Sequence, residues 1–307
     1  MARTGFVYRK ECLKHDAGQF HPESPNRLEA ILQAFIDAGI DPPLVDVEPA
    51  AKADILRIHS EEHYETIKRT CENNFPYPDP DTRMVRKSWD AALLAAGGAI
   101  SACKEVIDGE IDHAFWAMRP PGHHAEKSQA MGFCLFNNIA IAARWLQHEA
   151  GLKRVAILDW DIHHGNGTQH SFFEDDSVYY FSIHQHPHYP GTGYPDEKGK
   201  NNSNLNMQMP PGCAAEEWHR VMDAHVLPEL ERFDPDFLLV SSGFDAHRLD
   251  PLGHQLLEAE DYAGMTRKVK QVAGGRIVSL LEGGYHLEAL GWSAVAHFQA
   301  LCENGAA

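Results

Sequence analysis

The stretch Val155-Ala-Ile-Leu-Asp159-Trp-Asp-Ile-His163-His164 decides the fold, because a short apolar run passes directly into acidic and imidazole side chains. A continuous apolar run of this length, bounded by polar residues, is typical of a buried strand in a parallel sheet. Four further segments have the same design. They are Ala114–Met118 before His123 and His124, Val178–Phe181 before His184, Phe237–Val240 before Asp245, and Ile277–Leu281 before Glu282-Gly-Gly-Tyr285.

The polar residues after these runs predict one shared pocket. In open α/β sheets, ligands bind in the crevice beyond the carboxyl ends of the strands. Five strands that each end in residues able to bind a metal or move a proton indicate five contributions to one site, which is the arrangement of an enzyme. The five segments extend from His123 to Tyr285, so a domain boundary among them would divide the site. We therefore expect a single domain over residues 1–307.

Helical patterns alternate with the strands. Two more short strands are predicted at Phe6–Tyr8 and Ile55–Ile58, and a proline-rich loop on the rim of the pocket at Asn73–Thr82. The predicted helices are Leu28–Ala38, Trp89–Ile107, Ile139–Ala150, Ala215–Leu230 and Asp261–Val272. Alternation of this kind gives a parallel sheet with helices on both faces. The predicted fold class is therefore α/β, a single-domain three-layer α/β/α sandwich with a mainly parallel central sheet.

Charge and cysteine usage narrow the class of function. The net charge of −17 argues against direct binding to nucleic acid and suits a cationic substrate. The N-terminus lacks the apolar core of a signal peptide and no run approaches membrane-spanning length, so we expect no membrane partner. The six cysteines are scattered without metal-type spacing, which predicts reduced thiols and a cytoplasmic location. Cys134 is interpreted as a buried core thiol, with a place in the pocket lining as the alternative.

Three residues are candidate metal ligands. In an extended Asp161-Ile-His163 segment the two polar side chains point to the same side, where a carboxylate and an imidazole can chelate a divalent metal. Asp245, from another strand end, would be the third ligand. Three protein ligands with an open fourth position are typical of catalytic zinc, and this oxygen-rich set also suits Fe²⁺ in the cell. The structural alternative is a capping aspartate beside a hydrogen-bonded histidine.

Candidate proton-transfer groups follow two other strands. His123 and His124 come after a Pro-Pro-Gly turn, and imidazoles near an activated water can act as general base and then general acid. Such a histidine needs a partner for its second nitrogen, and Asp159 and Asn166 are the candidates. Tyr285 follows two glycines, and its phenol could donate a hydrogen bond to a developing oxyanion.

Together these motifs resemble the arginase/deacetylase superfamily, and within it the zinc-dependent histone deacetylases of class II and the bacterial histone-deacetylase-like amidohydrolases. The resemblance extends from His21 to about Tyr285. Asn166 is typical of class II, since class I would have aspartate there. The matching motifs are Arg119-Pro-Pro-Gly-His-His-Ala125, Gly132-Phe-Cys134, Asp159-Trp-Asp-Ile-His-His-Gly-Asn166, Gly243-Phe-Asp-Ala246 and Glu282-Gly-Gly-Tyr285.

The resemblance implies a role for each candidate residue in metal-assisted amide hydrolysis. Zn²⁺ would be bound by Asp161, His163 and Asp245. His124 would be the general base and acid, with His123 assisting through its pairing to Asp159, and Tyr285 would polarise the scissile carbonyl. A structural K⁺ is expected beside the metal. Its implied ligands are the side chains of Asp159 and Asp161 and carbonyls around His163, Ser182 and Ile183.

The resemblance also implies a narrow tunnel for an acetylated lysine peptide or a small acyl-amine. Gly132, Phe133 and Tyr189 would form its walls, and Arg27 would lie beneath the metal near the acetate exit. Polyamine-specific relatives are expected to have glutamate where Leu252 stands, which speaks against polyamines. Asp79 and Asp81 on the rim could bind a substrate amide or a distal ammonium. Other amides or esters are alternative substrates. The resemblance also allows a homo-oligomer, either a dimer or a tetramer.

Two other functions fit these motifs less well. An arginase-like ureohydrolase would need more carboxylates for a second manganese than Asp-Trp-Asp-Ile-His and Phe-Asp-Ala-His-Arg supply. A non-catalytic sensor of acyl ligands would be expected to lack a metal ligand, a catalytic histidine or Tyr285, and this chain has all of them.

Overall fold

The computed structural model describes residues 2–303, and its strands form one sheet in which every neighbouring pair is parallel. The order across the sheet is β1-β2-β7-β6-β3-β4-β5. The strands are β1 (Thr4–Val7), β2 (His113–Trp116), β3 (Val155–Asp159), β4 (Val178–Gln185), β5 (Asn204–Met209), β6 (Phe237–Ser242) and β7 (Ile277–Leu281). The expected parallel α/β sheet is confirmed.

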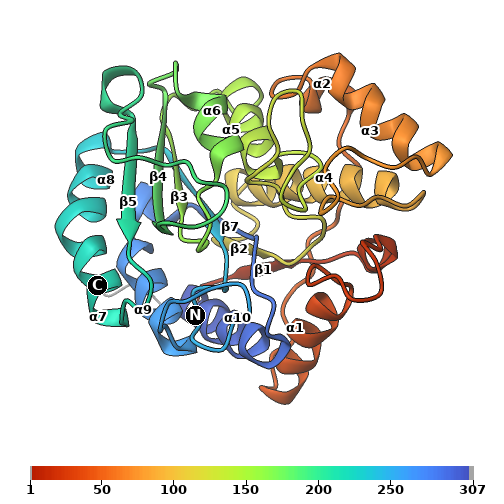
Figure 1. The fold of residues 1–307 in the computed structure, drawn as a ribbon. Coiled ribbons are helices and arrows are strands. Elements are labelled where there is room, and N and C mark those ends of the chain that lie inside the picture. The colour runs from red at the N-terminus through yellow and green to blue at the C-terminus, as the bar shows by residue number, and fades with distance from the viewer. Residues whose placement is uncertain (1, 304–307) are drawn as a thin grey trace.

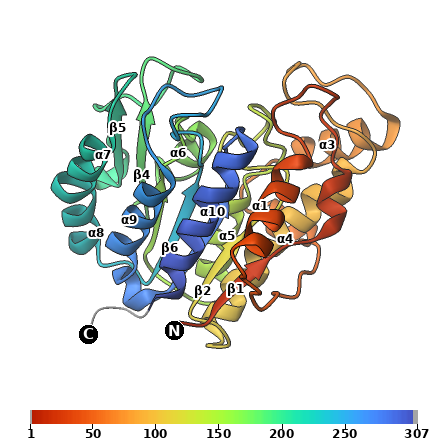
Figure 2. The ribbon, with the colours of Figure 1, turned by 90° about the horizontal axis from the view of Figure 1, so that it is seen from below.

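Helices cover both faces of the sheet (Figures 1 and 2), so the three-layer prediction is confirmed. One layer contains α4, α5 and α6, and the other contains α10, which packs between α1 and α9. The helices are α1 (Asn26–Asp37), α2 (Lys52–Ile55), α3 (Glu61–Asn73), α4 (Ser88–Ile107), α5 (Asn138–His148), α6 (Asn166–Phe172), α7 (Ala215–Val221), α8 (Leu227–Phe233), α9 (Ala259–Val269) and α10 (Leu287–Cys302).

Burial on both faces explains why the strands read as unbroken apolar runs. Every residue of β2, β3, β4, β6 and β7 is buried. A strand covered by helices on both sides has no solvent face and so shows no alternation of polar and apolar residues. These are the five strands that were predicted to be followed by metal-binding or proton-transfer residues. They occupy five consecutive positions in the sheet. Their carboxyl ends therefore meet along one edge.

Two elements differ from the prediction. Ile55–Ile58 is not a strand, since α2 ends at Ile55 and the chain turns, with His59 N–H donating to the Ile55 carbonyl at 2.9 Å. A segment of four residues, three of them apolar, fits a turn of helix as well as a strand. The segment predicted as Ala215–Leu230 contains a π-helical turn, Met222–Val226, between α7 and α8. Pro228 has no N–H to donate back to this turn, which accounts for the irregular turn there.

The sequence prediction missed β5 and α10. Asparagine is depleted in strands, yet Asn204 and Asn206 are buried in β5, where both amides donate to Gln169 Oε1. The helix α10 carries buried residues on most of its surface and has no clear polar face to reveal its period. No helix of the described residues has the length and apolar character needed to cross a bilayer.

Candidate active site

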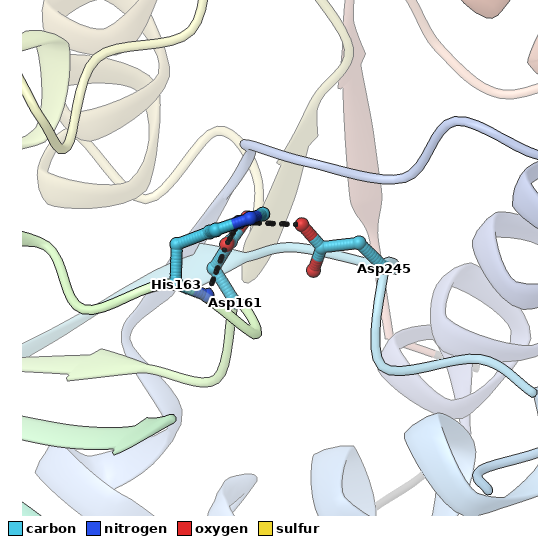
Figure 3. A group of neighbouring side chains, drawn as sticks. All are labelled: Asp161, His163 and Asp245. Carbon is cyan, nitrogen blue, oxygen red and sulfur yellow. Dashed lines mark hydrogen bonds and ion pairs between the residues drawn. The ribbon is translucent and has the colours of Figure 1, made fainter. Parts of the chain in front are cut away.

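The three predicted metal ligands lie together at the carboxyl edge of the sheet (Figure 3). Each of them offers a ligand atom within 4.8 Å of the others, and all three residues are buried. His163 Nδ1 lies 3.0 Å from Asp161 Oδ1 and 3.1 Å from Asp245 Oδ2. Asp161 and His163 follow β3 and Asp245 follows the neighbouring β6, so the parallel register brings the two loops side by side.

The donor set fits a divalent cation. Apart from its ion pair with His163 Nδ1, the buried Asp245 Oδ2 has no hydrogen-bond partner among the described residues, which leaves a carboxylate oxygen available to a metal. The backbone comes close on the other side, since a Cβ on Gly283 would overlap the carboxylates of Asp161 and Asp245. Two carboxylates and one imidazole are ligands of zinc and of other borderline metals. Asp161, His163 and Asp245 would therefore hold the metal.

Negative charge is concentrated below this edge. Asp159, Asp161, Asp245 and Glu282 are all buried, and within residues 2–303 their ion pairs are with His123 and His163 and with no lysine or arginine. Burial and the charge of Asp161 raise the pKa of Asp245 to about 7. Burial also raises the pKa of Glu282 to about 7. Buried charges of one sign are costly, so this cluster favours bound cations.

The two histidines have different partners. His123 Nδ1 lies 3.1 Å from Asp159 Oδ2, which also accepts from the Tyr180 hydroxyl at 2.9 Å. His124 Nδ1 lies 2.7 Å from Asn166 Oδ1. The structure thus places Asp159 and Asn166 where the sequence analysis expects the second-nitrogen partners.

The environments of the two rings separate their protonation states. Burial alone would lower the pKa of His123, but the charges of Asp161 and Asp159 outweigh it and raise the pKa to about 10. Burial, with the charges on His123 and His163, holds the pKa of His124 well below its usual value. At neutral pH His123 is therefore the cationic ring and His124 is the neutral one, which is the form a general base requires.

Glu282 fixes the turn that carries these histidines. Its Oε2 accepts hydrogen bonds from the backbone N–H groups of Gly122 (2.7 Å) and His123 (3.1 Å). Glu282 belongs to a motif of the sequence, but its role could not be predicted because its partners lie about 160 residues away in the chain.

Tyr285 reaches the site through a glycine turn. Gly284 has φ +113°, which side-chain-bearing residues rarely adopt, and Asp250 Oδ2 accepts from Tyr285 N–H at 2.6 Å. Burial raises the pKa of Tyr285 well above its usual value. The phenol therefore stays protonated and can donate a hydrogen bond.

A cavity of about 240 Å³ leads to these groups. Its wall includes every expected tunnel residue except Arg27, which is fully buried with its guanidinium against the Tyr285 ring. Cys134 is buried and does not line the cavity. The lining residues are Asp79, Asp81, His124, Gly132, Phe133, His163, His188, Tyr189, Leu252 and Tyr285.

His188 is a further site residue that was not predicted from the sequence. Its ring stacks on His163 with centroids 4.8 Å apart, and its Nε2 lies 2.9 Å from the Leu252 carbonyl. The signal was its position between two prolines directly after β4, next to Tyr189.

The rim loop is attached to the tunnel wall. Asp79 Oδ2 accepts from Gly132 N–H at 3.3 Å, and Thr82 Oγ1 accepts from Phe133 N–H at 3.1 Å. Asp79 is thus hydrogen-bonded to the wall, and both Asp79 and Asp81 line the cavity.

Comparison with known proteins identifies the family. Residues 21–301 match the profile described as the Histone deacetylase domain. A "Probable deacetylase" of Archaeoglobus fulgidus is 41% identical over 93% of this chain and 82% of its own length. A "Histone deacetylase-like amidohydrolase" of Pseudomonas aeruginosa is 37% identical over 92% of this chain and 82% of its own length.

A solved structure shows the same fold. The crystal structure of the HDA15 HD domain superposes with a TM-score of 0.93 at 36% identity, and the match covers 98% of this chain and 91% of that one. The fold, the cluster of metal-binding side chains and the sequence matches agree. This chain belongs to the histone deacetylase family of the arginase/deacetylase superfamily.

Proposed function

We propose that this member of a family of deacetylases and amidohydrolases is a zinc-dependent hydrolase that removes acetyl groups from acetyl-lysine-type amides. The observation that carries the proposal is that His124, His163 and Tyr285 line one cavity. A neutral base, a metal ligand and a protonated phenol thus face the same space, as amide hydrolysis requires. The products would be acetate and a free amine.

Asp161, His163 and Asp245 would hold Zn²⁺, or Fe²⁺ in the cell. When bound, such a metal supplies Lewis-acid polarisation of the substrate carbonyl and lowers the pKa of water. A structural K⁺ beside Asp159 and Asp161 would offset the remaining buried charge, since the ion pairs of these two carboxylates are with histidines.

His124 would move the protons of the reaction. With the acceptor Asn166 Oδ1 at 2.7 Å from Nδ1, the ring proton belongs on Nδ1 and the Nε2 lone pair is available. Nε2 takes a proton from water as its oxygen attacks the carbonyl, and returns it to the nitrogen as the C–N bond breaks. The cationic His123, paired with Asp159, stabilises the negative charge that develops nearby.

Tyr285 would donate its phenolic hydrogen to the carbonyl oxygen as that oxygen becomes negative. The Asp250 carboxylate and Arg27 hold the turn and the ring in place, so the donor is set before the substrate arrives.

The cavity wall suits an extended aliphatic chain. Phe133, Tyr189 and Leu252 supply apolar surface, and Asp81 supplies one carboxylate at the mouth. A lysine side chain has the shape for such a passage, and Asp81 would bind a substrate amide N–H or a distal ammonium. We further propose that residues 1–307 act as one domain in the cytoplasm and assemble as a dimer or tetramer.

The test is acetate release by the zinc-loaded enzyme and by Tyr285→Phe. The substrates are acetyl-lysine peptides, acetylated polyamines, and simple acyl amides and esters. Turnover of the lysine substrates that collapses in the variant would support the proposal. A clear preference for acetylpolyamines would mean that these are the substrate class and that the acidic rim, Asp79 and Asp81, selects them. No release from any substrate, with zinc measured as bound, would contradict the enzyme and favour a sensor of acyl ligands.

A further inference from the structure

Asn166, the hydrogen-bond partner of the proposed base His124, is itself held by hydrogen bonds on its other side. Asn166 is the first residue of α6, and its Nδ2 donates to Glu126 Oε1. The other acceptors around Nδ2 are the His124 carbonyl oxygen at 3.3 Å and Met131 Sδ at 3.5 Å. All three are acceptors. Glu126 is the one that carries a charge, so its hydrogen bond with the Asn166 amide is the strongest of the three.

A second residue of α6 also contacts the Glu126 carboxylate. His170 lies four residues after Asn166, on the same face of α6, and its Nδ1 is 2.8 Å from the same Oε1 atom. The hydrogen bond to Glu126 raises the pKa of His170. One carboxylate oxygen is thus shared by an inner amide and an outer imidazole.

The backbone of Glu126 is also fixed. Its N–H donates to the Gln129 carbonyl at 2.8 Å, and its carbonyl oxygen lies 2.9 Å from His59 Nδ1. Outside, Glu126 and His170 line a surface hollow of about 320 Å³. A chain of hydrogen bonds therefore connects the base of the reaction to this hollow.

The chain decides which way the Asn166 amide faces. A carboxylate can only accept, so the Asn166 NH₂ must point to Glu126 and Oδ1 must point to His124 Nδ1. Nδ1 then carries the ring proton and Nε2 keeps its lone pair. With the amide reversed, NH₂ would face Nδ1, the ring proton would move to Nε2, and the base would be lost.

We infer that Glu126 is a positioning residue for the reaction, which sets the tautomer of His124 by holding the Asn166 amide, with His170 as its outer support. This inference rests on the proposed function. Partners behind a catalytic imidazole are worth about 10- to 100-fold in activity when they orient it. An ordinary surface ion pair would contribute almost nothing to turnover.

The kinetic test compares Glu126→Gln with Glu149→Gln. Glu149 pairs with Arg57, which lines the same hollow, and Glu149 has no hydrogen bond to Asn166 among the described residues, so it is the matched control. We expect kcat of Glu126→Gln to fall about tenfold with KM within about twofold, while Glu149→Gln keeps wild-type values. Equal kcat for the two variants would overturn the inference.

The second arm combines Glu126→Gln with Asn166→Asp. Aspartate at 166 still accepts from His124, but it places a carboxylate against Glu126. The Glu126→Gln change should then raise kcat above that of Asn166→Asp alone, the reverse of its effect in the wild type. A structural role for Glu126 predicts a change in the same direction in both backgrounds, and that result would contradict the inference.

The third arm does not depend on turnover. In ¹⁵N-histidine-labelled protein, with the His124 signal assigned by its loss in His124→Ala, the wild type should show the proton on Nδ1. Glu126→Ala should shift His124 towards the other tautomer, and an unchanged tautomer would overturn the inference. If no amide is hydrolysed and the tautomer still shifts, the proposed function fails and the positioning role stands.

Discussion

The guanidinium of Arg27 lies against the face of the Tyr285 ring, with Arg27 Cζ 4.9 Å from the ring centroid. Arg27 also donates to the carbonyl oxygens of Gly284 (2.7 Å) and Glu282 (2.5 Å). One buried cation thus holds both the ring and the backbone turn that carries it. The position of the phenol is set from beneath, on the side away from the cavity.

Arg27→Lys should destabilise the fold because lysine keeps the charge but lacks the planar fork, which leaves a buried carbonyl without its donor. The unfolding free energy should fall by about 1–3 kcal/mol in urea titrations. Arg3→Lys is the control, since its pair with Asp112 is exposed and should change stability by less than about 1 kcal/mol. Equal losses in both variants would contradict the role given to Arg27.

Tyr285→Phe should lower kcat by about 10²- to 10³-fold, because a donor to the developing oxyanion is removed while the ring remains. The zinc content should stay at the wild-type value. Steady-state kinetics on an acetyl-lysine peptide, with metal analysis of the same samples, measures both. The exposed Tyr194→Phe should behave as wild type. A loss of less than threefold in Tyr285→Phe would exclude the phenol from the chemistry.

Zinc should stabilise the folded chain through Asp245. A ligand that binds the native state alone adds about 2.7 kcal/mol at a concentration one hundred times its Kd. Thermal unfolding with zinc and after chelation should therefore differ in the wild type, and the difference should vanish in Asp245→Asn. The exposed Asp37→Asn should keep the full response. A response to zinc that survives in Asp245→Asn would place the metal elsewhere.

Acid should destabilise the protein in part through His59. Its Nδ1 donates to the Glu126 carbonyl and its Nε2 accepts from Asn137 N–H, both at 2.9 Å, so the site fits a neutral ring. Burial, with the charge of His63, lowers the pKa of His59 to about 3. The unfolded chain, with a pKa of about 6.5, binds the proton first. The contribution of neutral His59 to the free energy of unfolding is therefore complete above about pH 6.5 and is lost as the pH falls towards 3.

The measurement for His59 is urea unfolding at pH 7 and pH 5. Linkage gives a loss of about 2 kcal/mol from this one histidine over that interval. The pH dependence of His59→Gln should be smaller by that amount. The same slope in variant and wild type would show that His59 is not responsible.

Leu252→Glu should shift the substrate preference towards acetylated polyamines, because Leu252 lines the cavity and a carboxylate there would attract a distal ammonium. We expect the ratio of kcat/KM values, polyamine over lysine peptide, to rise about tenfold, or about 1.4 kcal/mol. Leu252→Gln controls for size. If both variants shift the ratio equally, charge at this position does not select the substrate.

How far the sequence could predict this site depended on how local each signal was. The closeness of Asp161 and His163 could be predicted because two alternating residues of one extended segment point to the same side. The pairing of His124 with Asn166 followed from chemical need and a short list of candidates. His188 was missed because its contact with His163 arises only when the chain returns after β4. Glu126 was missed because its partner lies 40 residues away.

The same distinction explains the errors in the fold. Strands that are buried on both faces appear in the sequence as apolar runs, so the five central strands could be predicted. The edge strand β5 could not, because Asn204 and Asn206 are tolerated there by hydrogen bonds to Gln169 that no local pattern shows. The roles proposed for the individual site residues stay predictions until the variants are measured.

The parallel sheet also separates the loops that form the site from turns at its other edge that could be altered. The site segments all follow the strands, whereas the turns that precede β3, β6 and β7 meet around a hollow at the opposite edge, lined by Arg154, Asp234 and Gly274 among others. A strand of five residues spans about 16 Å, so an affinity peptide or reporter spliced in between Ala273 and Gly274 would stand well away from the reacting groups. For protein engineering, that edge is the natural place to attach this enzyme to a surface or a fusion partner without disturbing its active site.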